Sequence, residues 1–157
     1  MMERPALVNR FLQLRRLAFV GVSRHPRDFS RALFRDLIGR GYDVVPVNPH
    51  GVEALGRRSF ARVQDIDPPV EGALIMTPRA QTEGAIKDCV AAGVRLVWLH
   101  RGAGQGSVTP DALEICEEHG LDVVPGACPY MYLEYPGFFH SAHAFLRRVF
   151  ARGDRAA

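Results

Sequence analysis

The feature that most constrains the fold is the alternation of short apolar runs with segments of helical periodicity. Leu17–Val20 is a continuous apolar run followed directly by Gly21, as expected of a strand buried on both faces. Residues 30–39 carry apolar side chains at helical spacing and stop at glycines, and residues 42–47 are apolar again. These three segments span about thirty residues, the length of a βαβ unit. The sequence therefore predicts two parallel strands joined by a crossover helix.

The alternation continues along the chain, interrupted by an irregular stretch over 48–69 that holds one short strand near 58–60. Alternating strands and helices are typical of a parallel sheet with helices on both faces. We predict a single α/β domain over 1–157 with a Rossmann-like parallel sheet, a core over 16–135 and a helical extension over 138–151. The expected strands are 17–20, 42–47, 72–76, 94–99 and 121–124, and the expected helices are 5–14, 30–39, 79–92, 109–120 and 138–150.

Charge and composition argue against nucleic-acid and membrane partners. The net charge is only +3, and its arginines are scattered rather than clustered. No apolar stretch has the length of a membrane span, and the amino terminus lacks a signal-peptide pattern. The three cysteines, Cys89, Cys116 and Cys128, are far apart, which indicates a reducing compartment. We expect a cytoplasmic protein.

Small, hydroxyl-bearing and glycine residues collect directly after the predicted strands. Loops between strands and helices need such residues for turning, which is one interpretation. The other is ligand binding, because open parallel sheets bind ligands outside the carboxyl ends of their strands. The loops concerned are Gly21–Arg24, Asn48–His50, Thr77–Arg79, His100–Gly104 and Gly126–Pro129.

The first of these loops has the chemistry of a phosphate site. Gly21 allows close approach of the backbone, and the following helix offers unpaired N–H groups. Ser23 and Ser30 supply hydroxyls, and charge neutralisation falls to Arg24, Arg27 or Arg31 because Lys87 is the only lysine. The GxGxxG fingerprint is missing, and the second strand ends without the acid that binds the ribose of NAD. Coenzyme A, with a 3′-phosphate beside its pyrophosphate, matches this pattern, and NADP matches it in part.

The segments VGVSRHPRDFSRALFRDLIGRGYDVVPVNP, MTPRA and GLDVVPGACP resemble the CoA-binding domain family. This family includes stand-alone bacterial CoA-binding proteins and the amino-terminal domain of the succinyl-CoA synthetase α subunit. The resemblance covers Leu17 to Glu134 and implies that the first loop holds phosphates, the second flanks adenosine and the third lies along pantetheine. It departs at His50, where many relatives have lysine. The implied ligand-binding residues are Gly21, Val22, Ser23, Arg24, Ser30, Asn48, Pro49, His50, Thr77, Pro78 and Gly102.

Three functions remain open from the sequence. The first is a non-catalytic CoA or acyl-CoA binding protein acting as carrier, sensor or regulator. The second is an NADP- or nucleotide-dependent enzyme that uses His100 or Cys128 in the same crevice. The third is an interaction subunit without a ligand. The synthetase also uses a second α domain with a phosphorylated histidine and a β subunit, so we expect no synthetase activity here.

No catalytic set or metal site is predicted from the remaining candidate residues. Cys128 fits a packing position better than a mixed disulfide with CoA. His140 and His143 are three apart on a predicted helix but lack a third metal ligand nearby. A group of aromatic residues near the carboxyl terminus fits either the core or an interface in a homo-oligomer, and comprises Tyr130, Tyr132, Tyr135, Phe138 and Phe139.

Overall fold

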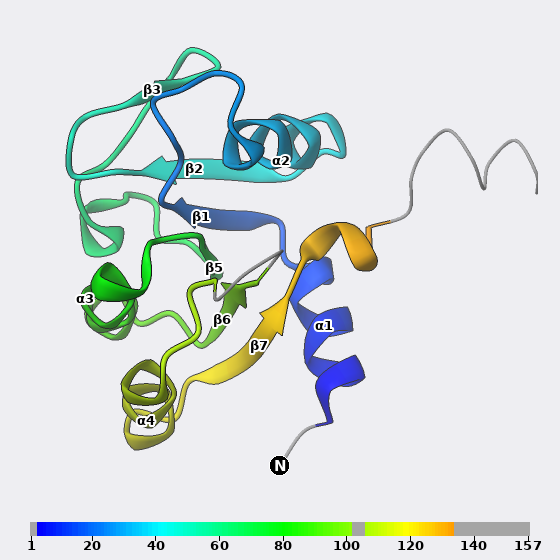
Figure 1. Cartoon of the computed structure of the whole chain (residues 1–157), viewed down its shortest axis with the longest axis vertical. Coiled ribbons are helices and arrows are strands. Elements are labelled where there is room, and N and C mark those ends of the chain that lie inside the picture. The colour runs from blue at the N-terminus through cyan, green and yellow to red at the C-terminus, as the bar shows by residue number, and fades with distance from the viewer. Residues whose placement is uncertain (1–2, 102–105, 134–157) are drawn as a thin grey trace, which may run out of the picture.

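The structure is a computed structural model that describes residues 3–101 and 106–133. Its centre is a five-stranded sheet in which all strands run parallel, in the order β2-β1-β5-β6-β7 (Figure 1). The α/β, Rossmann-like fold class is therefore confirmed. The strands are β1 Arg16–Val20, β2 Asp43–Val47, β5 Gly72–Ile75, β6 Leu96–His100 and β7 Asp122–Ala127.

Helices cover both faces of this sheet and create two separate apolar cores. α1 (Arg4–Gln13) and α2 (Phe29–Gly39) pack in one core, whereas α3 (Arg79–Ala91) and α4 (Pro110–Glu118) pack in the other. Figure 1 shows α3 and α4 together on the side of the sheet opposite α1. Alternate residues of β1 face the two cores, with Phe19 on the α2 side and Ala18 on the α3 side.

The two outer strands are the two that contain proline. Pro46 lies in β2 and Pro125 in β7. Because proline lacks the N–H that an inner strand must donate, it is tolerated at a sheet edge. β7 was predicted to end at Val124, but it continues to Ala127 with a register shift opposite Leu99/His100. This irregular end is held by the Ala127 carbonyl, which accepts hydrogen bonds from Trp98 Nε1 at 2.9 Å and from the Arg101 N–H at 3.2 Å.

Other element bounds differ modestly from the prediction. β6 begins at Leu96 rather than residue 94, because the Val94 N–H closes the end of α3 on the Cys89 carbonyl. α4 begins after Thr109, whose Oγ1 accepts from the Ala112 N–H at 3.0 Å. The predicted helix over 138–150 lies outside the described residues.

The irregular stretch after β2 contains a hairpin and a short 3-10 helix, and a second short 3-10 helix follows β7. β3 (Glu53–Ala54) pairs with β4 (Arg57–Arg58), and Phe60 forms a parallel bridge with Val47. The strand predicted near 58–60 is thus present as β4 and this bridge, which together flank the outer edge of β2. The short 3-10 helices are η1 (Val63–Asp65) and η2 (Pro129–Met131).

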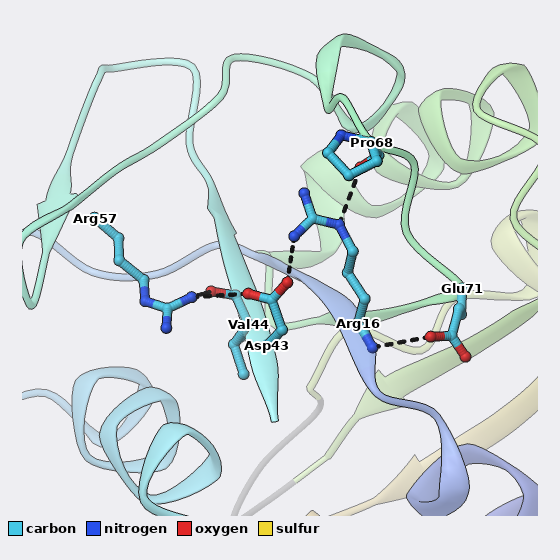
Figure 2. A network of polar contacts seen from close by, with 6 residues as sticks. All are labelled: Arg16, Asp43, Val44, Arg57, Pro68 and Glu71. Carbon is cyan, nitrogen blue, oxygen red and sulfur yellow. Dashed lines mark hydrogen bonds and ion pairs between the residues drawn. The ribbon is translucent and has the colours of Figure 1, made fainter. Parts of the chain in front are cut away.

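An ionic network joins the amino ends of β1 and β2 (Figure 2). Arg16 donates to Asp43 and, through Nε, to the Pro68 carbonyl at 3.0 Å. Arg57 of β4 donates to Asp43 at 3.0 Å and to the Val44 carbonyl at 2.9 Å. Partial desolvation of Asp43 is outweighed by its hydrogen bonds from Arg16 and Arg57, so the pKa of this carboxyl lies below its ordinary value. The network links the β3–β4 hairpin to the amino end of β2, away from the loops that follow the carboxyl ends of the strands.

Candidate functional site

The order of the strands places the loop after β1 beside the end of β5. The connection after β1 leads to β2 on one side of β1, whereas the connection after β5 leads to β6 on the other side, so the two connections run in opposite directions. Open α/β sheets bind ligands at this topological switch point, outside the carboxyl ends of the strands. The predicted residues Gly21 and Thr77 therefore come from the two loops that flank the switch point.

Gly21 is a position at which a side chain would not fit. Its φ is +98°, and a Cβ there would lie 2.7 Å from the Met76 carbonyl oxygen and 3.1 Å from the Thr77 nitrogen. Its N–H donates to the Val47 carbonyl at 3.1 Å, while the Met76 N–H donates to Val20 at 2.8 Å. Only glycine satisfies both the backbone angle and the contact. The loop after β1 thus packs against the backbone that directly follows β5.

Hydrogen bonds link Ser23 of the first loop to Ser30 in the first turn of α2 and to Asp28 just before it. The Ser23 N–H donates to Ser30 Oγ at 3.0 Å. Ser23 Oγ donates to Asp28 Oδ2 and accepts from the His25 N–H at 3.1 Å. Asp28 occupies the N-cap position of α2 but makes no side-chain hydrogen bond to its first turn. The Ser30 hydroxyl accepts from Ser23 and keeps its proton to donate, whereas the Ser23 hydroxyl holds the loop closed.

Asn48 ties the second loop to the first. Its Nδ2 donates to the Val22 carbonyl at 3.0 Å, and its Oδ1 accepts from the His50 N–H at 2.8 Å. Val22 is buried, whereas Pro49 and His50 are exposed beside it. The Asn48 side chain therefore links the loop after β1 to the loop after β2 and holds the two loops next to one another.

The third loop is held by hydroxyl groups. Thr77 is buried, with its Oγ1 3.1 Å from Thr82 Oγ1. The Thr77 carbonyl accepts from Ser107 Oγ at 2.7 Å. Pro78 follows at the N-cap position of α3 and is exposed. Ser107 was not predicted, because its partner is a backbone carbonyl thirty residues away in sequence.

Positive charge dominates the first loop and its helix. Residues 21–31 contain three arginines and one aspartate, Asp28. Arg31 Nη1 donates to the Glu53 carbonyl at 2.7 Å and so joins the β3–β4 hairpin to α2. Arg24 and Arg27 are exposed and form no ion pair with residues 3–101 or 106–133. Both are therefore available to an anion at the carboxyl ends of the strands.

His100 and Cys128 occupy different environments at the same edge. His100 is the last residue of β6, and burial lowers the pKa of its imidazole. Cys128 is half-buried after β7. Cys116 and Cys89 are buried in the core between α3 and α4, where desolvation raises the pKa of the Cys116 thiol to about 11 and that of Cys89 further. These two thiols remain protonated and unreactive at neutral pH.

Several predicted features lie outside the described residues or away from the loops. Gly102, His140 and His143 fall among the residues that are not described. Within 3–101 and 106–133, no three metal-binding side chains cluster, and no helix is long and apolar enough to cross a membrane. One cavity of about 430 Å³ lies along 58–61, and another of about 510 Å³ lies between α1 and α4. Neither is lined by Gly21, Ser23 or Thr77.

The sheet order and the glycine loop at its switch point define a Rossmann-like α/β domain. Residues 15–134 match the family model described as CoA binding domain, and the chain belongs to that family. The family resemblance found in the sequence is therefore confirmed.

Relatives of this chain include both stand-alone proteins and part of a ligase. The uncharacterized protein YneT of Bacillus subtilis (strain 168) is 28% identical over 73% of this chain and 82% of its own length. The acetate–CoA ligase (ADP-forming) II subunit alpha of Pyrococcus furiosus is 24% identical over 78% of this chain but only 28% of its own length. A solved hypothetical protein of Pyrococcus horikoshii OT3 has a TM-score of 0.74 and 25% identity, covering 83% of this chain and 89% of that one.

Proposed function

We propose that this protein binds coenzyme A or an acyl-CoA across the loops that follow β1, β2 and β5. The observation that carries the proposal is the contact of Gly21 with the backbone of Met76 and Thr77, at the switch point and next to the start of α2. Membership of the CoA binding domain family supports this choice of ligand. The first turn of α2 offers N–H groups that Asp28 does not cap, a suitable partner for a pyrophosphate.

The charged residues support an anionic ligand with more than one phosphate group. Arg24 and Arg27 are exposed on the loop that leads into α2, whose first turn contains Ser30, and His50 is exposed after β2. The residue directly after β2 is Asn48 rather than an acid, and its side-chain amide already links the loops after β1 and β2. This arrangement disfavours the ribose contact made to NAD.

We further propose that the protein binds this ligand in the cytoplasm without transforming it, as a carrier, sensor or regulator. Two of its three cysteines are buried, with thiol pKa values raised by burial, and His100 has no carboxylate partner among the described residues. The ligase subunit that it resembles is much longer, since the match spans 28% of that subunit. We therefore do not extend the ligase activity of that subunit to this protein.

Isothermal titration calorimetry with CoA, NADP and NAD tests the proposal. We expect CoA to bind, NADP to bind more weakly and NAD to give no heat. Tighter binding of NADP than of CoA would overturn the proposal and favour the nucleotide-dependent enzyme instead. Binding of none of the three would favour an interaction subunit.

A further inference from the structure

Three aromatic rings from three separate elements meet beside the start of α2. Phe29 is the first residue of α2, His100 the last of β6, and Tyr130 belongs to η2. The Phe29 ring lies 5.4 Å from His100 and 5.5 Å from Tyr130, measured between centroids. The Tyr130 hydroxyl donates to Asp36 of α2 at 2.5 Å. We call Phe29, His100 and Tyr130 the aromatic cluster.

The aromatic cluster has an apolar face that is open to solvent. Phe29 is 46% exposed, which is unusual for a large ring with two aromatic neighbours. Its position is fixed from both sides, because Tyr130 is anchored to α2 and His100 ends an inner strand of the sheet. The cluster is therefore a rigid apolar surface next to the proposed phosphate site.

One polar atom of the aromatic cluster has no partner. His100 Nε2 is buried and forms no hydrogen bond within the part of the chain that the structure describes. Buried nitrogens without partners are uncommon because each forfeits its hydrogen bonds to water. Burial also lowers the pKa of His100, so the neutral ring is favoured and Nε2 can accept or donate one hydrogen bond, depending on the tautomer.

The pantetheine arm of CoA has the complementary chemistry. It leaves the pyrophosphate as a chain of apolar groups interrupted by two amides, each of which needs a hydrogen-bond partner. Resting on the proposed function, we infer that the aromatic cluster binds this arm, with Phe29 covering its apolar groups and His100 Nε2 bonding to one of its amides. His100 is then a specificity residue for the arm rather than an acid or base.

Binding measurements with two ligands test this inference. Adenosine 3′-phosphate 5′-diphosphate carries the nucleotide part of CoA without the pantetheine arm. We expect His100→Leu to weaken CoA about tenfold, the worth of one hydrogen bond, and to leave the affinity for the nucleotide unchanged. His100→Gln, which keeps a hydrogen-bonding group, should recover part of the lost affinity. His119→Leu is the matched control, since His119 is exposed at the end of α4.

The outcomes separate the inference from the proposed function. If the wild-type protein binds both ligands but His100→Leu weakens both equally, or neither, the role of His100 is wrong and the nucleotide site stands. If the wild-type protein binds neither ligand, the proposed function fails and the inference falls with it.

A measurement on the unmodified protein adds an independent check. The ¹⁵N resonance of His100 Nε2 should shift with CoA but not with the nucleotide, and a shift with both would contradict the inference.

Discussion

Replacing Gly21 with alanine probes the contact on which the candidate site is built. The new Cβ would lie 2.7 Å from the Met76 carbonyl oxygen and 2.8 Å from its carbon, and φ there is +98°. The backbone angle alone costs roughly 1–2 kcal/mol for a residue with a side chain. The overlap adds about 1–3 kcal/mol, since both neighbouring atoms belong to the backbone of Met76, directly after β5, and can move little. We expect Gly21→Ala to lower the free energy of unfolding by about 2–5 kcal/mol.

Urea unfolding followed by circular dichroism measures this loss, and Gly84→Ala provides the matched control. Gly84 lies within α3, and a Cβ there would meet nothing within 4 Å. Alanine should stabilise the helix at that position by about 0.5–1 kcal/mol. Equal effects of the two substitutions, or a loss below about 1 kcal/mol at Gly21, would refute the reasoning, because strain and overlap would then be relieved by loop movement.

Three further predictions concern charged side chains and the hydrogen bonds that link the loops. Arg24→Ala should weaken CoA by about tenfold to a hundredfold without changing the melting temperature, and unchanged affinity in calorimetry would remove Arg24 from the site. Asn48→Ala should cost about 1–2 kcal/mol in urea unfolding and also weaken CoA, because the loops after β1 and β2 lose their link; wild-type values would contradict this. The lowered pKa of Asp43 contributes stability above about pH 4 that is lost as the carboxyl protonates, so Asp43→Asn should flatten the acid limb of a stability profile.

Local patterns in the sequence predict the five strands of the main sheet and its four helices among the described residues, together with the end of the sheet at which the ligand loops collect. Continuous apolar runs such as Leu17–Val20 and helical spacing such as that over 30–39 are local patterns, and burial in a parallel sheet requires them. Parallel strands joined by crossover helices place all their following loops at one edge. The loops after β1, β2 and β5 were therefore predicted together. Proline in the middle of β2 and of β7 also carried a signal for the two edge strands, which the prediction did not use.

Only the tertiary structure decided which side chains meet at that edge. The order of the strands puts β5 beside β1, and this brings Met76 against Gly21 from more than fifty residues away. Hydrogen-bond partners such as Asp28 for Ser23 depend on how the loop closes, which residue type alone does not specify. The aromatic cluster brings together residues of α2, β6 and η2, and no local pattern in the sequence relates these three segments to one another. Local patterns report burial of a segment, whereas contacts between distant segments depend on packing and register of the whole sheet.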